Sequence, residues 1–222
     1  MRSHNTFAPG GWYHCYNRGV EKRRVFETNR DYERFLQTLY LCNNSERVHQ
    51  DDLREWSHAE ILQYPREDTL VNIGAYCLMS NHFHLLLQSK QEGAVSKFMH
   101  RVGISYTMYF NIKNERTGNL FMRPFRSKHI SEDRYFKRVA QYIHLNPAEL
   151  FEPGWKQGRI KNASTLDKKL QGYGFSSYPD YFGIHRPERV ILANEAVSLL
   201  SENTLSISKL ITEAAAYYQE LT

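Results

Sequence analysis

The chain has 222 residues, 41% of them hydrophobic, which suits one large domain or one domain with an appendage and excludes disorder throughout. No stretch approaches the roughly 18 consecutive apolar residues of a membrane span, and residues 1–6 contain no apolar segment typical of a secretion signal. The net charge of +5, with 15 tyrosines and 12 phenylalanines, is compatible with single-stranded nucleic acid as a partner, because Lys and Arg contact phosphates while aromatic rings stack on bases.

The first half of the chain predicts a strand, a helix, two strands and a second helix. Residues 11–20 are aromatic, alternate in polarity and are bounded by glycines, which is typical of a strand. A helix is expected from Asp31, which we assign as its N-cap, because apolar residues recur beyond it at helical spacing. Adjacent buried strands follow at 70–79 and 82–89, joined by a tight turn, and a second helix occupies about 93–113.

Two further segments complete the predicted domain. Residues 43–69 are polar and irregular, and we interpret them as a surface insertion with a short helix around 52–62. A fourth strand is expected at 120–130, where Pro124 indicates an edge position or a bulge. The next helix, about 132–146, ends before a proline.

This order, β-α-β-β-α-β and a further helix, predicts the split βαβ, ferredoxin-like fold: an α+β domain with an antiparallel sheet and helices on one face. We assign residues 1–155 to this domain. Residues 156–222 are expected to form a C-terminal extension packed on it, with an aromatic loop at 172–183 and amphipathic helices at 187–201 and 207–221. The open sheet face of this fold is a common platform for nucleic acid.

Two histidines, His82 and His84, mark the start of the third expected strand. Because successive strand side chains alternate faces, both point to one side of the sheet and Phe83 points to the other. Two imidazoles side by side form half of a metal site. The alternative is a pair of polar residues on a partly solvated sheet face. The leucines that follow indicate a core strand. A pair of histidines in a core strand favours a functional role over simple packing.

The last helix of the predicted domain carries a second pair, Tyr142 and Asn146, four residues apart and therefore on one helix face. The Asn146 amide could complete the site that the histidines begin, with the Tyr142 phenol beside it. Two imidazoles and a carbonyl oxygen suit Mg²⁺ or Mn²⁺ and leave positions open for a substrate phosphate. The alternative is a tyrosine packed on the sheet and an asparagine that caps the helix C-terminus.

Together these motifs resemble the single-tyrosine transposases of the IS200/IS605 type, and in particular their domesticated relatives, the REP-associated tyrosine transposases. His82-Phe83-His84 has the form of the HUH motif (His, hydrophobic, His). The resemblance covers roughly residues 10–185, with 43–69 as extra material, and no motif can be placed in 186–222. The segments that carry it are 13–19, 81–86, 126–128, 142–147 and 176–178.

The resemblance implies a DNA transposase with a tyrosine nucleophile. Tyr142 matches the residue that attacks a phosphodiester of single-stranded, hairpin-bearing DNA and leaves a 5′-phosphotyrosine and a free 3′-OH. His82 and His84 match two ligands of a divalent metal, Mg²⁺ or Mn²⁺, and Asn146 matches the third. A tyrosine, with a pKa of about 10, is a poor nucleophile until something favours its phenolate. The metal would act mainly as a Lewis acid on the scissile phosphate.

Other residues compete with this assignment or support it. Tyr135 lies seven residues before Tyr142, on roughly the same helix face, and is an alternative nucleophile or a neighbour of the site. His14 could contact the site or DNA, or pack in the core. Phosphate contacts are expected from four basic residues: Arg18, Arg123, Arg126 and Lys128.

A second class of function stays open, namely a catalytically idle module that holds single-stranded nucleic acid on the same sheet. The intact histidine, tyrosine and asparagine set favours the enzyme. A phosphodiesterase would want a second histidine motif near a Ser or Thr, which the sequence lacks. Cys15, Cys42 and Cys77 are odd in number and have no C-x-x-C spacing, so we expect reduced thiols in a cytoplasmic protein. The resemblance implies a bacterial protein that is nucleoid-associated when it acts, and either a monomer or a homodimer.

Overall fold

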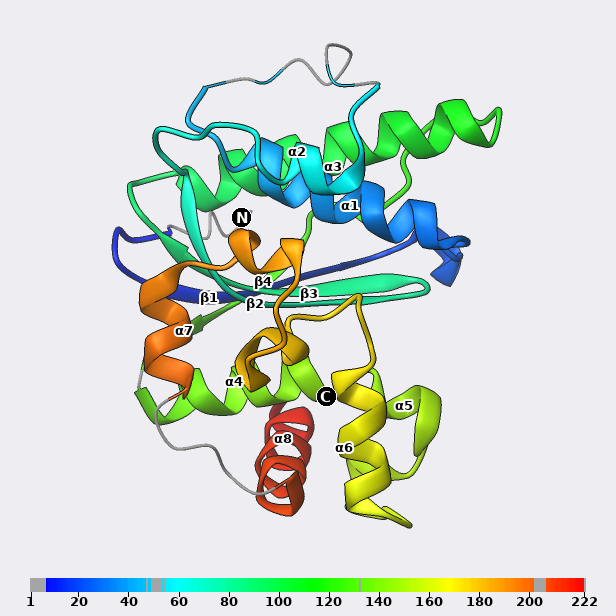
Figure 1. The fold of residues 1–222 in the computed structure, drawn as a ribbon, viewed down its shortest axis with the longest axis vertical. Helices are drawn as coiled ribbons and strands as arrows, with labels where there is room; N and C mark the ends of the chain where they lie inside the picture. Colours follow the sequence, from blue (N-terminus) through cyan, green and yellow to red (C-terminus); the bar gives the residue numbers. More distant parts are fainter. Residues whose placement is uncertain are drawn as a thin grey trace, which may run out of the picture.

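A four-stranded antiparallel sheet lies at the centre of the protein, with its strands in the order β2-β3-β1-β4 (Figure 1). The computed structural model describes residues 7–46, 48, 53, 55–131, 133–201 and 207–221. The strands are β1 (Trp12–Arg18), β2 (Val71–Met79), β3 (His82–Ser89) and β4 (Arg126–Ile130). This order and pairing belong to the split βαβ arrangement, so the expected α+β fold class is confirmed.

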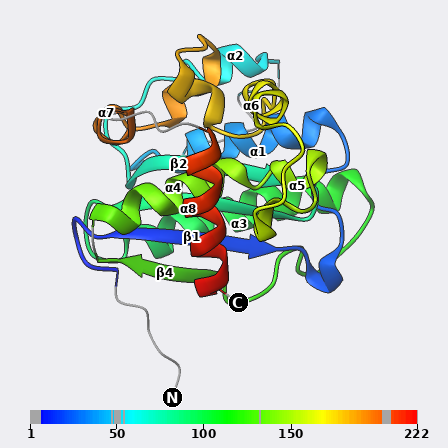
Figure 2. The same ribbon diagram turned by 90° about the horizontal axis from the view of Figure 1, so that it is seen from below.

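Helices cover both faces of the sheet, whereas the sequence led us to expect them on one. Figures 1 and 2 show α1 and α3 on one side and α4, backed by α8, on the other. The reason is that β2 and β3 bury residues on both faces along nearly their whole length, and such strands need a cover on each side. The helices are α1 (Asn29–Cys42), α2 (His58–Ile61), α3 (Ala94–Lys113), α4 (Asp133–Leu145), α5 (Ala148–Phe151), α6 (Ala163–Gln171), α7 (Asn194–Ser201) and α8 (Ile207–Leu221).

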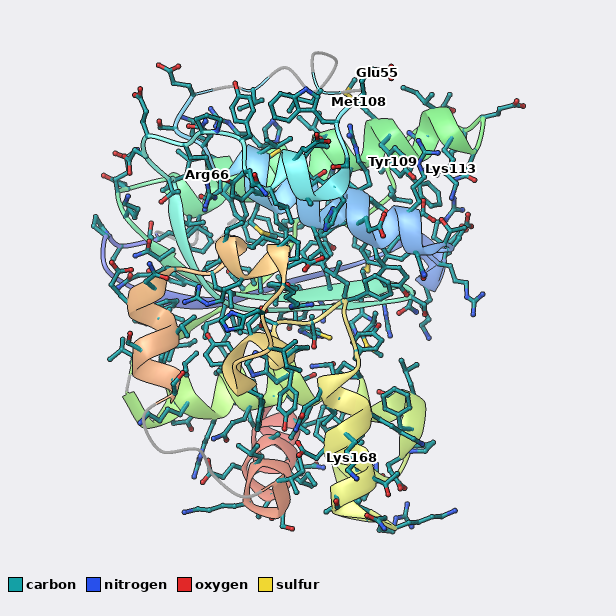
Figure 3. The ribbon with its side chains drawn as sticks, in the orientation of Figure 1. Glu55, Arg66, Met108, Tyr109, Lys113 and Lys168 are labelled. Carbon is teal, nitrogen blue, oxygen red and sulfur yellow. The ribbon has the colours of Figure 1, made fainter. Side chains whose placement is uncertain are left out.

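The N-terminus of α1 is fixed by a capping box in which Asp31 is not the N-cap. Thr28 holds that position, and Asp31, three residues later, accepts hydrogen bonds from the backbone N–H groups of Glu27 and Thr28, each at 2.9 Å. From α3, the Tyr109 hydroxyl and the Lys113 ammonium (both labelled in Figure 3) donate to the same carboxylate at 2.8 Å. Asp31 therefore joins the start of α1 to the end of α3.

Replacing Asp31 with asparagine is expected to lower the free energy of unfolding by roughly 1–3 kcal/mol, because buried donors lose a charged acceptor. Burial raises the pKa of the Asp31 carboxyl, but hydrogen bonds from Lys113, Glu27, Tyr109 and Thr28 outweigh it, so the pKa lies below its ordinary value. The stabilisation is thus present above the pKa of an unfolded-state aspartate and is lost as the pH falls through the folded-state pKa. Urea unfolding of wild type and Asp31→Asn should show a difference that shrinks on acidification; a difference independent of pH contradicts this role.

The fourth strand is shorter than the sequence predicts. Residues 120–125 do not join the ladder, and regular pairing with β1 begins only at Arg126. Met122 donates its backbone N–H to the carbonyl of Arg18, and Phe121 forms an isolated bridge with Gly19. Pro124, which has no N–H to donate, then interrupts the pairing. The predicted edge position is observed, since β4 pairs with β1 alone.

The described part of the segment 43–69 lies over the α1 and α3 side of the sheet (Figure 1). Its two ends are joined where the Asn43 side chain exchanges hydrogen bonds with the backbone of Val71. The helix expected at 52–62 is a single turn, α2, with Ser57 as N-cap. Residues 47, 49–52 and 54 lie outside the described part of the chain. A capping box between Ser57 and Glu60 fixes the start of α2, and the helix ends at Ile61 with Leu62 as C-cap.

The chain beyond residue 155 packs against β2 and α4. The aromatic loop 172–183 lies on the sheet edge, where Ser177 exchanges hydrogen bonds with the backbone of Tyr76, and Arg186 donates to Asp180 and to the Tyr76 hydroxyl. The loop 172–183 contains the 3-10 turn Tyr178–Phe182. Three further 3-10 turns are described elsewhere in the chain, at Val20–Lys22, Trp155–Gln157 and Pro187–Ile191. Across the part of the chain that is described, no helix is long and apolar enough to cross a membrane.

The two C-terminal helices differ in how well the sequence predicted them. The pattern over 207–221 gives α8 with the same bounds. The pattern over 187–201 gives a 3-10 turn and then α7, separated by an extended Leu192. There the backbone N–H of Ala193 donates to the carbonyl of Ile73 on β2. That sheet contact replaces the helical hydrogen bond, which the local apolar spacing could not indicate.

Candidate active site

The two histidines of β3 lie on the face of the sheet that α4 covers. The rings of His82 and His84 are 5.1 Å apart between centroids and nearly perpendicular. Phe83 between them points to the opposite face, where it packs on Phe35 of α1 and on Phe121. The alternation predicted for a strand is therefore observed, and the histidine side of β3 remains for polar chemistry.

Tyr142 of α4 and Asn146, the residue directly after α4, reach the same place. The Tyr142 ring lies edge-on to His84, with 5.5 Å between centroids. One turn later, the Asn146 side chain donates its N–H to the backbone carbonyl of Tyr142 at 2.7 Å. Asn146 and His82 line the same cavity. The four residues singled out in the sequence line one cavity of about 790 Å³.

The hydrogen bonds of the two imidazoles orient their free nitrogens. His82 Nδ1 lies 2.6 Å from the side-chain oxygen of Asn81, and the amide nitrogen of Asn81 donates to the backbone carbonyl of Lys22. Because the Asn81 amide nitrogen donates to Lys22, the Asn81 oxygen is the atom that faces His82. His82 Nδ1 is therefore the protonated donor, and its Nε2 carries no hydrogen. His84 Nδ1 lies 2.9 Å from His14 Nε2, which again leaves Nε2 of His84 as the outward ring nitrogen.

Burial keeps both imidazoles uncharged near neutral pH. Burial, with smaller contributions from the charges of Arg18 and Lys156, lowers the pKa of His82 to about 4. Burial likewise lowers the pKa of His84 well below its ordinary value, with His14 and His82 adding to the effect. The neutral imidazole is the form that ligates metal ions. These two histidines can therefore act as ligands at neutral pH without losing a proton first.

The Tyr142 side chain is enclosed, with 5% of its surface exposed. Trp155 and the α8 residues Tyr217 and Tyr218 surround its ring at centroid distances of 5.3 to 6.3 Å. Burial raises the pKa of the Tyr142 phenol above its ordinary value, and the nearby Tyr218 adds to this. The phenol is therefore protonated at neutral pH, so using it as a nucleophile requires a neighbour that favours the phenolate.

The donor set fits a divalent cation that prefers nitrogen and oxygen ligands. Within the described residues there is no group of three His, Cys, Asp or Glu side chains able to hold a metal. The set in this cavity instead combines two neutral imidazoles, His82 and His84, with an amide, Asn146. Such a set binds a divalent cation less tightly than a carboxylate cluster does. It also leaves coordination positions open for water or phosphate, an arrangement that suits Mg²⁺ or Mn²⁺.

The basic residues expected to contact DNA fall into two groups. Arg18 and Arg126 are exposed and line the cavity. Arg123 is exposed but does not line it, and Lys128 lies over the ring of Tyr217, 5.1 Å from its centroid. Of the roles considered for His14, the structure shows burial in the core and contact with the site, because it is fully buried and its Nε2 lies 2.9 Å from Nδ1 of His84. A contact between His14 and DNA stays a prediction.

Sequence reasoning missed several residues of the cavity. Tyr16 shares a strand face with His14 and stacks on His84 at 5.5 Å, so its alternation along β1 could have identified it. Lys156, which pairs with Glu149, and Tyr218 also line the cavity, but they come from segments without a motif. The alternative nucleophile Tyr135 is not among the described residues that line this cavity.

Comparison with known proteins identifies a family. The family model described as "Transposase IS200 like" matches residues 35–146, a segment that contains both histidines, the tyrosine and the asparagine. The chain belongs to the IS200-like transposase family. A solved structure of a REP-associated tyrosine transposase bound to a REP hairpin is 12% identical, with a TM-score of 0.49 over 93% of this chain and 95% of that one. No curated protein matches the chain.

Proposed function

We propose that this transposase-family protein cleaves and rejoins single-stranded, hairpin-bearing DNA through a covalent 5′-phosphotyrosine, with Tyr142 as the nucleophile. One observation carries the proposal: His82 and His84 of β3, Tyr142 of α4 and Asn146, which directly follows α4, line a single cavity. Arginines at its edge, Arg18 and Arg126, suit a polyanion. The hairpin-bearing substrate is inferred from the resemblance of the motifs.

In the proposed step, the Tyr142 hydroxyl oxygen attacks a DNA phosphorus atom. A bond forms between Oη and phosphorus, the bond from phosphorus to the 3′ oxygen breaks, and that oxygen takes up a proton while the phenol loses one. Positive charge near the phenol favours this loss. Arg18, Arg126 and Lys156 line the cavity. In the proposed step they would hold the phosphate through charge-assisted hydrogen bonds and bring positive charge toward the phenol.

A divalent metal would be held by His82, His84 and Asn146. When bound, Mg²⁺ or Mn²⁺ supplies Lewis-acid chemistry that withdraws negative charge from the scissile phosphate. The protein's own contribution is to present two bare imidazole nitrogens that are already neutral. Asn81, through its 2.6 Å bond to His82 Nδ1, fixes the orientation of one of them.

A second candidate function is an idle module that binds single-stranded nucleic acid without cutting it. The enclosure of Tyr142 beneath Tyr217 and Tyr218 of α8 is the observation that favours it. A module that only binds would use the arginines at the cavity edge and would not need the phenol. The two functions therefore differ in whether a covalent bond between protein and DNA ever forms.

A covalent-adduct assay separates the two functions. Labelled single-stranded DNA carrying a panel of hairpins is incubated with the protein and Mg²⁺ or Mn²⁺, resolved on a denaturing protein gel, and the adduct is digested for mass spectrometry. We expect an EDTA-sensitive band whose phosphotyrosine maps to the peptide containing Tyr142. A phosphotyrosine on Tyr135 or Tyr218 moves the nucleophile. Binding without an adduct on any hairpin supports the idle module.

A further inference from the structure

Three buried side chains from three different elements form a hydrogen-bonded chain behind the site. The hydroxyl of Tyr217 on α8 lies 3.1 Å from Nδ1 of His14 on β1, and Nε2 of His14 lies 2.9 Å from Nδ1 of His84 on β3. Tyr217 and His14 are fully buried, and His84 is nearly so. The proposed metal ligand is thus linked to the C-terminal helix through one intervening imidazole.

From this chain we infer that Tyr217 and His14 are positioning residues that keep Nε2 of His84 bare for a metal ion; this inference rests on the proposed function. A neutral imidazole carries one proton, so its two nitrogens have opposite roles. If His84 Nδ1 donates to His14 Nε2, then His14 Nδ1 must donate to the Tyr217 oxygen, and His84 Nε2 is free to ligate. If all protons shift the other way, His84 Nε2 carries a hydrogen and cannot ligate.

The Tyr217 oxygen gives the buried N–H of His14 an acceptor in the ligating arrangement. In that arrangement the buried N–H of His14 points at the hydroxyl, and a buried N–H without an acceptor is among the rarest defects in folded proteins. In the reverse arrangement His14 Nδ1 carries a lone pair and no hydrogen. Without the Tyr217 oxygen, that lone pair is unpaired, which costs less free energy than an unpaired buried N–H. Removing one oxygen on α8 should therefore move a proton on β3.

The test is Tyr217→Phe, read by the ¹⁵N spectra of the histidine rings, in which protonated and bare nitrogens resonate in separate ranges. In metal-free wild type we expect His84 to be protonated mainly at Nδ1. In wild type saturated with Mg²⁺ we expect His14 to be protonated at Nδ1. In the variant, the His84 proton should move toward Nε2. The affinity for Mn²⁺, measured by the EPR signal of the free ion, should fall roughly tenfold.

Tyr218→Phe is the matched control, because Tyr218 is the next residue on α8 and contacts Tyr142. This variant should leave the His84 tautomer as in wild type. The inference is overturned if Tyr217→Phe changes neither the His84 tautomer nor the Mn²⁺ affinity. It is also overturned if His14 in Mg²⁺-saturated wild type is protonated at Nε2. This second measurement does not depend on the folding of any variant. Neither readout uses DNA. If the protein forms no adduct but Tyr217→Phe shifts the His84 tautomer, the proposed function is rejected while the inferred role of Tyr217 and His14 stands.

Discussion

Tyr142→Phe is expected to abolish DNA cleavage and the covalent adduct while leaving the binding of hairpin DNA within about twofold of wild type. The variant removes the oxygen atom that forms the bond to phosphorus in the proposed step, and loss of a nucleophile typically costs at least about 10⁴-fold in rate. The ring remains, so its packing on His84 and Trp155 is retained. Single-turnover cleavage of labelled DNA, run beside filter binding of the same DNA, measures both quantities.

Two matched variants make this prediction sharp. Tyr135→Phe removes a hydroxyl from the same helix, outside the cavity, and should leave the cleavage rate within a few-fold of wild type. Tyr218→Phe removes a hydroxyl from within the cavity but from α8. A cleavage rate that survives in Tyr142→Phe and is lost in either of these variants assigns the nucleophile to that other tyrosine.

The candidate site could be predicted from the sequence because each half depends on a local rule. The period of two along a strand places His82 and His84 on one face, and the spacing of four along a helix places Tyr142 and Asn146 on another. What the two patterns could not supply is that these faces oppose each other. We expected all helices on one side of the sheet, whereas α4 covers the other side and closes the cavity.

The parts that could not be predicted depend on contacts between distant segments. His14 has the same alternation as any strand residue, and only the position of α8 shows that it joins Tyr217 to His84. Lys156 enters the cavity from a 3-10 turn without a motif. The break between the Pro187–Ile191 turn and α7 likewise depends on a hydrogen bond to β2. Tertiary contacts of this kind override local periodicity and leave no local pattern in the sequence.

Removal of either histidine proposed as a ligand is expected to eliminate metal binding under conditions in which wild type is saturated. His82→Gln and His84→Gln each replace an imidazole nitrogen with an amide, which is a poorer ligand, and we expect the affinity for Mn²⁺ to fall by at least about 100-fold and cleavage to fall with it. Metal that binds the folded state raises stability. Wild type should therefore show a Tm that increases with Mn²⁺ concentration, and both variants should lose this increase.

Graded variants can separate a ligand from the residue that orients it. Asn81 bonds to His82 Nδ1 without being a candidate ligand, so Asn81→Ala should weaken Mn²⁺ binding by roughly tenfold, less than His82→Gln. His100→Gln, at an exposed position on α3, controls for loss of a histidine elsewhere and should change nothing. If His82→Gln and His84→Gln bind Mn²⁺ as wild type does, the metal is held elsewhere. The basic residues of the cavity would then have to stabilise the phosphate without it.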